Sequence, residues 1–414
     1  PYRRQRQMCI RDSKKAGYPG HEIAEMALMR LYDLTGEQKY LDLAKYFIDE
    51  RGTKPYYYDI ERGLTCPEGE ERYSYNQANR PVRQQDEVQG HSVRAVYLYS
   101  GMADVARATQ DESLLKACET LWNNMVHQKM YVTGGIGATH IGEAFSFNYD
   151  LPNDTAYAET CASIGLVFFA RRMLEIQAKA EYADVMELAL YNGVLSGMAL
   201  DGKSFFYVNP LESKGDHHRQ EWYGCACCPS QLSRFLPSIG NYIYASSDDA
   251  LWVNLYIGNT GQIRIGETDI LLTQETDYPW DGSVKLTIST SQPLEKEIRL
   301  RIPDWCKTYD LSINGKRINV PKEKGYAVIK DWKSQDVIAL DMDMPVEIVA
   351  ADPHVKENFD KRAIQRGPLV YCMEEIDNPV YFDQIQLSPS TTFQTAFAVS
   401  YTHLRAHETC ADLV

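Results

Sequence analysis

The stretch that decides the fold is residues 92–125, SVRAVYLYSGMADVARATQDESLLKACETLWNNM, where two helical patterns follow each other closely. The first covers Ser92–Thr109 and the second Leu114–Met125, with apolar side chains at helical spacing. Gln110-Asp111 forms only a short break between them. Two helices joined by so short a loop pack as antiparallel neighbours, so the sequence predicts a helical hairpin here.

Two similar hairpins flank this one. They are predicted over His21–Leu34 with Tyr40–Ile48 and over Ala158–Ile176 with Ala178–Leu195. A further helix is predicted from Pro229, a favoured first-turn residue, to about Tyr244. Repeated helical hairpins are typical of an α/α toroid. A closed (α/α)6 toroid needs about twice as many helices as this pattern shows, so we expect the N-terminal hairpins to lie upstream of Lys14.

After Ser246 the apolar period changes to two, which indicates strands. Asn314-Gly315 is a strong signal for a two-residue hairpin turn. We therefore expect an α+β multidomain chain, with a partial toroid at 14–246 followed by an antiparallel β-sandwich at 247–349. Residues 350–397 are expected to begin a second β-module. The strands predicted for the sandwich are Leu251–Ile257, Val284–Thr290, Ile298–Ile302, Leu311–Ile313, Tyr326–Ile329 and Val337–Leu340.

The two ends of the chain have a different character from the rest. Residues 1–13 are basic and show no apolar period, and residues 398–414 follow abruptly on the sheet-like region without strand alternation. Both are expected to be non-native tails and are set aside from fold reasoning.

Composition excludes two classes of partner. The net charge of −14 over 414 residues argues against nucleic acid, because phosphate binding needs basic surface. No apolar run approaches the length needed to cross a bilayer. Ten cysteines in so long a chain are not a disulfide framework, and clustered thiols favour a reducing compartment, which predicts a cytoplasmic location.

Cysteines gather at Cys225, Cys227 and Cys228, and an acidic-thiol pair, Glu159 and Cys161, lies upstream. Two sulfurs from one segment, with one sulfur and one carboxylate from another, form a four-ligand set that suits tetrahedral zinc. Such a set serves either a closed structural zinc site or a zinc-activated cysteine enzyme. From the residues alone, both interpretations stay open.

Other polar residues have plainer interpretations. Glu159 could pair with Arg171 or Arg172 instead of a metal. His217-His218 is interpreted as a solvated loop, and Asp86-Glu87 as surface charge or support for His91. Alone, Glu143 would be a solvated loop residue, and His21 and His91 ordinary helix-start residues.

Five motifs, in consistent order, resemble the β-L-arabinofuranosidase family of glycoside hydrolases, family 127. The resemblance covers roughly residues 14–397, and the combination of Glu-x-Cys with Cys-Cys-Pro is its most specific part. The motifs are Gln89–Ala95, Ala156–Ala162, Tyr207–Leu211, Cys227-Cys228-Pro229 and Gln365–Tyr371.

The resemblance implies an (α/α)6 barrel followed by β-sandwich modules, and it implies roles for individual residues. Cys227 would be the nucleophile and Glu143 the general acid/base. The ligands of Zn²⁺ would be Glu159, Cys161, Cys227 and Cys228. The sugar would contact His21, His91 and Tyr207.

The implied function is a zinc-dependent retaining exo-glycosidase that releases terminal β-L-arabinofuranose from plant-type glycans through a cysteine glycosyl-enzyme intermediate. Because the expected N-terminal hairpins are absent, the fragment itself could be inactive. A related exo-glycosidase of different sugar specificity, or a carbohydrate-binding protein with a structural zinc site, is the alternative. Self-association through the sheet modules is left open.

Overall fold

Helices are present in each of the three predicted hairpin segments of the computed structural model, which describes residues 17–290, 296–375, 378, 382, 385–387 and 391–395. The two tails set aside above lie outside these residues. Contacts between Cα atoms divide the chain into two compact units. The first consists of Pro1–Ile176, Phe206–His218 and Asp352–Glu357, and the second of Gln177–Phe205, Arg219–Ala351 and Asn358–Val414.

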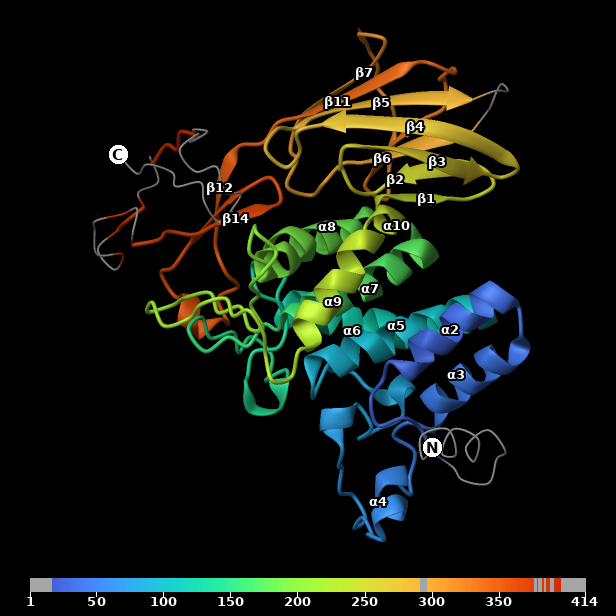
Figure 1. Ribbon diagram of the computed structural model, residues 1–414, viewed down its shortest axis with the longest axis vertical. Helices are drawn as coiled ribbons and strands as arrows, with labels where there is room; N and C mark the ends of the chain where they lie inside the picture. Colours follow the sequence, from blue (N-terminus) through green and yellow to red (C-terminus); the bar gives the residue numbers. More distant parts are fainter. Residues whose placement is uncertain are drawn as a thin grey trace. The chain divides into compact units, whose positions relative to one another are not determined.

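In the first unit the helices pair as predicted (Figure 1). Helix α2 (Ala24–Thr35) packs on α3 (Gln38–Glu50), and α5 (Ser92–Thr109) packs on α6 (Glu112–Gln128). The unit also contains α7 (Thr160–Gln177) and a short helix that the sequence pattern did not predict, α4 (Tyr57–Arg62). Single 3-10 turns lie at η1 (Ser74–Asn76), η2 (Val82–Gln84) and η3 (Ile141–Glu143).

The break between α5 and α6 has a local cause. The carboxylate of Asp111 accepts a hydrogen bond from the backbone N–H of Leu114 at 3.0 Å and so caps the first turn of α6. Helix α5 is buried along nearly its whole length. It passes close to α7, since a Cβ added at Gly165 would lie 2.3 Å from Cγ2 of Val96. These two helices therefore form the centre of the first unit.

The second unit begins with helices that are more broken than predicted. The helix expected over Ala178–Leu195 is α8 (Ala180–Ala189), which then widens into a π-turn, η4 (Leu190–Val194), and a 3-10 turn, η5 (Leu195–Gly197). In the widened turn the amide of Asn192 donates to the carbonyl of Pro368 at 2.8 Å and accepts from the N–H of Val370 at 3.0 Å. The turn is thereby tied to the strand that begins at Leu369.

The helix expected from Pro229 to Tyr244 starts earlier and is interrupted. Helix α9 covers Cys227–Phe235, a 3-10 turn η6 covers Leu236–Ser238, and α10 covers Gly240–Ile243. Pro229 is tolerated in the first turn because the missing N–H would have no partner within the helix there. Pro237 lacks the N–H that would continue α9. Cys227 and Cys228 are therefore the first two residues of a helix.

Sheets make up the rest of the second unit, as predicted. Within the described residues, one sheet has the strand order β1-β2-β6-β10-β9 and another the order β3-β4-β5-β11-β7-β8. The bounds of the first are β1 (Tyr244–Ser246), β2 (Ala250–Val253), β6 (Glu297–Arg301), β10 (Tyr326–Ile329) and β9 (Lys322–Glu323). The bounds of the second are β3 (Asn259–Ile265), β4 (Thr268–Thr276), β5 (Ser283–Thr290), β11 (Val337–Met342), β7 (Tyr309–Ile313) and β8 (Lys316–Arg317).

The two sheets share one apolar core, which is the defining feature of a sandwich. Leu251 and Leu300 of the first sheet and Leu286 and Leu340 of the second are fully buried in the same cluster. A third sheet follows, with the order β12 (Val346–Val349), β13 (Ala363–Arg366) and β14 (Leu369–Tyr371). The predicted fold class, a helical domain followed by antiparallel sheets, is confirmed.

Three details of the sheets differ from the sequence prediction. Strands β2 and β6 pair in parallel, because the whole β3–β4–β5 meander lies between them in the chain and supplies the crossover. The strand expected over Leu251–Ile257 ends at Val253, where Asn254 turns its side chain to the hydroxyl of Tyr326 at 2.8 Å. The hairpin β3–β4 was missed because β3 is mostly polar, and its residues alternate between partial and full exposure up to the buried Ile265.

The predicted hairpin turn at Asn314-Gly315 joins β7 to β8, and both residues have positive φ, 51° and 77°. A type I′ turn requires that conformation. Among the residues that the structure describes, no helix combines the length and apolar character that crossing a membrane requires.

Candidate metal and active site

A short loop places Glu143 beside His91. Gly142 and Glu143 both have positive φ, 72° and 52°, so the chain reverses sharply there. The backbone of Ala144 then bridges to His91, and the N–H of Phe145 donates to the carbonyl of Gly90 at 2.9 Å. Gly90 is needed because a Cβ there would lie 2.1 Å from the carbonyl oxygen of Ser74. The two loops are therefore fixed to each other by their backbones.

Both carboxylate oxygens of Glu143 have a partner. Nε2 of His91 lies 2.8 Å from Oε2, and the hydroxyl of Tyr157 donates to Oε1 at 2.8 Å. The side chain of His91 is almost buried, whereas that of Glu143 keeps about a third of its surface exposed, 35%. Glu143 is thus held in one orientation and still accessible, which is the arrangement a proton-transferring group needs.

Glu159 and Cys161 flank the first residue of α7, and both side chains are buried. Their segment is anchored because the N–H of Thr160 donates to the carbonyl of Tyr207 at 2.9 Å. The arginines considered as partners of Glu159 pair elsewhere, Arg171 with Glu175 and Arg172 with Asp104. The ligand atoms of His91, Glu143 and Glu159 all lie within 4.8 Å of one another.

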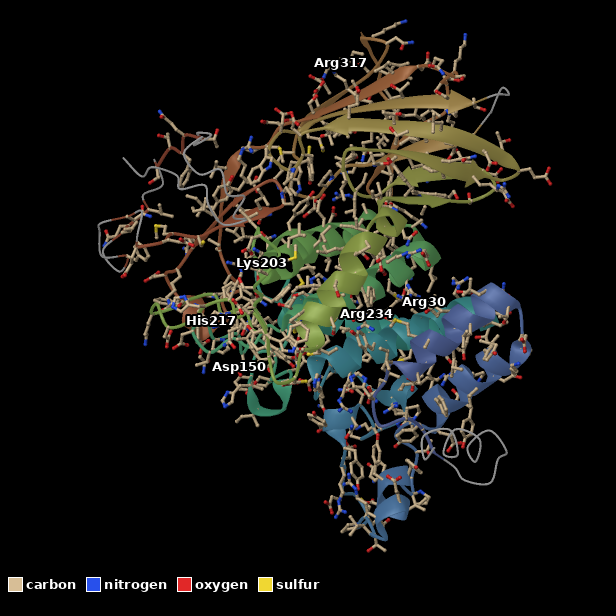
Figure 2. The ribbon with its side chains drawn as sticks, viewed as in Figure 1. Arg30, Asp150, Lys203, His217, Arg234 and Arg317 are labelled. Atoms are coloured by element: carbon tan, nitrogen blue, oxygen red, sulfur yellow. The ribbon has the colours of Figure 1, made fainter. Side chains whose placement is uncertain are left out.

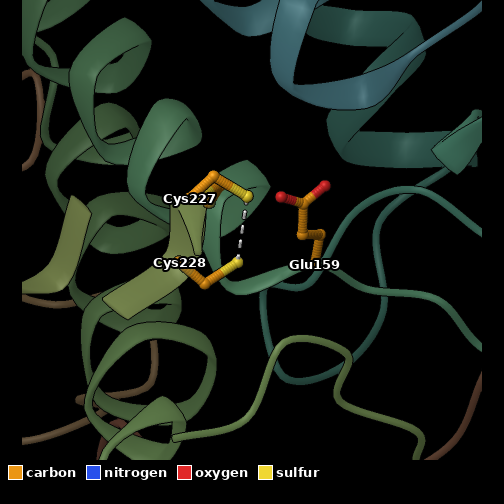
Figure 3. Close-up of side chains that lie close together, drawn as sticks. Glu159, Cys227 and Cys228 are labelled. Atoms are coloured by element: carbon orange, nitrogen blue, oxygen red, sulfur yellow. Dashed lines mark hydrogen bonds between the residues drawn. The ribbon is translucent and has the colours of Figure 1, made fainter. Parts of the chain in front are cut away.

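Cys227 and Cys228 begin α9, and their Sγ atoms lie 3.9 Å apart (Figure 3). Cys228 is fully buried, whereas Cys227 is partly exposed. Figure 3 shows the carboxylate of Glu159 directed toward the two sulfurs. Cys225, the third cysteine of the sequence cluster, is exposed and is not one of the grouped ligands.

One ligand atom from each of Glu159, Cys161, Cys227 and Cys228 lies within 4.8 Å of the other three. In a tetrahedral site with metal–sulfur bonds of about 2.3 Å, two sulfurs stand about 3.8 Å apart. The Cys227–Cys228 separation of 3.9 Å agrees with that value. This buried group of one glutamate and three cysteines could therefore bind a metal ion.

The other predicted binding residues lie as follows. His21 is exposed, with its ring 6.0 Å from that of Tyr97. The ring of Tyr207 lies edge-on to that of Tyr157, at 6.1 Å. His21 does not belong to either of the two ligand groups found among the described His, Cys, Asp and Glu residues.

His217 differs from the solvated loop residue that was expected. Its ring stacks on Phe206 at 4.7 Å and its Nε2 lies 2.9 Å from the carbonyl oxygen of Val208, whereas His218 is exposed. Figure 2 labels His217 on this loop. Glu87 pairs with Lys129 at 2.6 Å and so supports that lysine.

Tyr157 received no role from the sequence, although it lies inside the quoted motif Ala156–Ala162. The one available signal was its position two residues before Glu159. Its contact with Glu143 depends on the fold, because the two residues lie on different loops.

A helical domain followed by β-sheet domains, with a carboxylate–thiol group and an accessible glutamate held by Tyr157 and His91, defines a class of multidomain proteins with a candidate metal centre. Comparison of the sequence with models of known protein families shows which family within this class the chain belongs to. They match the β-L-arabinofuranosidase GH127 catalytic domain at residues 2–241, the GH127 middle domain at 250–344 and the glycoside hydrolase family 127 C-terminal domain at 346–408. The chain belongs to glycoside hydrolase family 127, the β-L-arabinofuranosidase family, so the predicted resemblance is confirmed.

Individual relatives support the same family assignment. A curated non-reducing end β-L-arabinofuranosidase of Bifidobacterium longum subsp. longum is 41% identical over 395 residues, an alignment that covers 89% of this chain and 59% of the relative. The crystal structure of a GH127 β-L-arabinofuranosidase from Geobacillus stearothermophilus T6 is 48% identical with a TM-score of 0.88, covering 92% of this chain and 63% of that one. A further GH127 β-arabinofuranosidase structure is 44% identical with a TM-score of 0.85, covering 92% and 61%. The chain thus spans about three fifths of the length of these relatives.

Proposed function

We propose that this protein is a zinc-dependent retaining exo-glycosidase that releases terminal β-L-arabinofuranose from plant-type glycans. One observation carries the proposal. Glu159 belongs to both groups of possible metal ligands, the one with the three cysteines and the one with His91 and Glu143. The accessible carboxylate of Glu143 and the thiol of Cys227 therefore both lie near the side chain of Glu159. A glycosidase that retains configuration needs a nucleophile and an acid/base close to one anomeric carbon.

The proposed zinc ligands are Glu159, Cys161, Cys227 and Cys228, as the resemblance implied. When bound, zinc would keep the coordinating thiols deprotonated. Among the three cysteines of the group, Cys161 and Cys228 are buried and Cys227 is partly exposed. The partial exposure of residue Cys227 supports it as the nucleophile, because an attacking residue must reach the substrate.

The chain's own residues would divide the reaction into two displacements. In the first, Sγ of Cys227 bonds to the anomeric carbon while Glu143 gives its proton to the departing glycosidic oxygen. In the second, Glu143 takes a proton from water, the water oxygen bonds to the anomeric carbon, and the carbon–sulfur bond breaks. Two inversions restore the β configuration in the released sugar.

His91, Tyr207 and His21 are proposed to contact the sugar. His91 has the strongest support, because its ring is held against Glu143 at 2.8 Å and so adjoins the reacting carboxylate. Tyr207 lies edge-on to Tyr157, which itself bonds to Glu143. For His21 the proposal rests on the resemblance; its ring lies 6.0 Å from that of Tyr97.

A second reading has one observation in its favour. Four protein ligands form a closed set, and closed sets are typical of structural zinc sites. On that reading the chain is a carbohydrate-binding protein with a structural zinc. A related exo-glycosidase of different sugar specificity would keep the mechanism and change only the released sugar.

Further parts of the proposal concern the whole molecule. We take residues 14–246 as the catalytic domain, 247–349 as a β-sandwich and 350–397 as the start of a second β-module. Thiol ligands favour a reducing compartment, which supports a cytoplasmic location. Self-association through the sheet modules belongs to the same proposal.

The test is arabinose release from an aryl β-L-arabinofuranoside by the zinc-supplied chain, with the configuration of the first-formed sugar followed by NMR. Release of β-arabinofuranose supports the proposal, and initial formation of the α anomer contradicts a retaining mechanism. A folded, zinc-containing chain that hydrolyses no furanoside in a panel of pentofuranosides contradicts the enzymatic role and favours the binding protein.

A further inference from the structure

Lys129, the residue directly after α6, is a buried lysine to which the proposed mechanism gives no role. Its side chain is only 3% exposed, and lysines are almost never buried so deeply unless they are paired. The ammonium donates to the carbonyl of Val88 at 2.9 Å, to the carbonyl of Ser146 at 2.7 Å and to the carboxylate of Glu87 at 2.6 Å. An ammonium has three donors, so each of them has an acceptor, and the acceptors lie on two separate segments of the chain.

These two segments carry the candidate acid and the histidine that contacts it. Val88 lies three residues before His91, and Ser146 lies three residues after Glu143. Nε2 of His91 and Oε2 of Glu143 are 2.8 Å apart. Lys129 therefore binds both segments at a second point, close in the chain to the residues that meet.

Two residues at the C-terminal end of α6 bind the same segments. Oδ1 of Asn124 accepts from the N–H of Val88 at 2.9 Å, and Nδ2 donates to Oδ1 of Asn148 at 3.0 Å. The carbonyl of Gln128 accepts from the N–H of Tyr149 at 2.8 Å. Helix α6 itself packs on the buried helix α5 (Figure 1). The three residues that bind the segments, which we call the α6 clamp, are Asn124, Gln128 and Lys129.

The two segments also contact each other directly. The N–H of Phe145 donates to the carbonyl of Gly90 at 2.9 Å, and the hydroxyl of Ser92 donates to the carbonyl of Glu143 at 3.2 Å. Contacts between loops open locally at a lower free energy than packed helices do. The clamp adds hydrogen bonds to a helix end, and those of Lys129 are strengthened by its charge.

We propose that Lys129 is a positioning residue of the active site, which keeps His91 and Glu143 in contact by holding both of their segments against the end of α6. The inference rests on the proposed function, because only a glycosidase that uses Glu143 as its acid depends on where that carboxylate lies. A general acid must come within hydrogen-bond reach of the glycosidic oxygen. A displacement of about 1 Å caused by a distant substitution costs up to about a hundredfold in rate.

The first test compares Lys129→Met with the zinc-supplied wild type on two β-L-arabinofuranosides. Dinitrophenol, the leaving group of one, departs without a proton, whereas methanol, the leaving group of the other, needs the acid. We expect kcat/KM on the methyl glycoside to fall about tenfold more than on the dinitrophenyl glycoside, because a displaced Glu143 fails where a proton is required. A variant that is merely less stable contains less folded enzyme and loses the same fraction on both substrates.

Arg172→Met is the matched control, since it also removes a buried cation of the first unit, the partner of Asp104 at 2.6 Å. It should leave the ratio between the two substrates unchanged. Glu87→Gln is a gentler variant that keeps both carbonyl contacts of Lys129, and it should shift the ratio in the same direction by less. An active Lys129→Met enzyme with the wild-type ratio overturns the positioning role.

Hydrogen exchange of backbone amides gives a second readout that needs no substrate. In Lys129→Met, peptides covering residues 86–92 and 143–149 should exchange about tenfold faster than in Arg172→Met, as expected for lost hydrogen bonds to a charged group. Faster exchange in a chain whose wild type hydrolyses neither glycoside supports the clamp and counts against the proposed function alone. Equal exchange of these peptides in the two variants overturns the clamp.

Discussion

The phenolic hydroxyl of Tyr157 donates a hydrogen bond to Oε1 of Glu143 at 2.8 Å, while the other carboxylate oxygen faces Nε2 of His91. A phenol can only donate to a carboxylate, so Oε1 is fixed as an acceptor. The proton that a general acid carries is thereby directed to Oε2. Tyr157 is a positioning residue in this arrangement.

Replacing Tyr157 with Phe removes that hydrogen bond and keeps the ring. We expect kcat to fall about fivefold to tenfold on an aryl glycoside, the effect of roughly one hydrogen bond. The loss should be larger on a methyl glycoside, because a poor leaving group depends more on protonation. The check is a steady-state comparison of both substrates.

Tyr149→Phe is the control, since that ring stacks on His354 at 4.9 Å. An equal loss on aryl and methyl substrates in Tyr157→Phe would show a merely structural role.

The nucleophile assignment predicts that Cys227→Ser keeps the fold and loses turnover. A serine hydroxyl is far less ionised than a metal-bound thiol, so we expect at least about a thousandfold loss in kcat. Circular dichroism checks the fold and arabinose release checks the activity. Cys225→Ser, two residues away and exposed, should remain active. Substantial activity in Cys227→Ser would remove this cysteine as the nucleophile.

Elemental analysis should find one zinc per chain, and Glu159→Gln should lower that content. Metal that binds only the folded chain stabilises it by mass action, so a chelator should lower the melting temperature of the wild type more than that of the variant. Glu175→Gln, which alters a surface pair with Arg171, is the control and should keep its zinc. Equal responses to the chelator in Glu159→Gln and the wild type would contradict the ligand assignment.

A buried charge cluster predicts a pH dependence of stability. The carboxylates of Glu22 and Glu25 both face the one guanidinium of Arg51, at 2.8 Å and 3.2 Å, and all three side chains are fully buried. Burial raises the pKa of Glu22 from 4.5 to about 7, against the opposing effect of Arg51. Between these values the folded chain holds a proton on Glu22 that the unfolded chain has released, so the contribution of Glu22 to stability is greatest below pH 4.5 and falls as pH rises toward 7.

Glu22→Gln should remove this part of the pH dependence. As pH rises from 4.5 to 7, the unfolding free energy of the wild type should fall relative to that of the variant by up to about 3 kcal/mol. Urea unfolding at several pH values measures it. Glu61→Gln, at an exposed position, is the control. A constant difference across this range would show that Glu22 does not titrate there.

Local pattern predicted much of the fold. The apolar runs placed α5 at Ser92–Thr109 and β10 at Tyr326–Ile329 with the bounds that the structure has, and both elements are buried along nearly their whole length. The Asn314-Gly315 turn followed from backbone sterics alone. Where the pattern was weak, as in the polar strand β3, or where a side chain bonds a distant segment, as Asn192 does, prediction failed.

For the candidate site, too, some features could be predicted from the sequence and others could not. The sequence by itself determined which residues have the chemistry, since Glu-x-Cys and Cys-Cys-Pro are rare and specific combinations. Only the tertiary structure decided that four ligand atoms lie within 4.8 Å of one another and that Tyr157 bonds to Glu143. Such contacts join residues distant in the chain, and their distances depend on how helices and loops pack, which no local periodicity encodes.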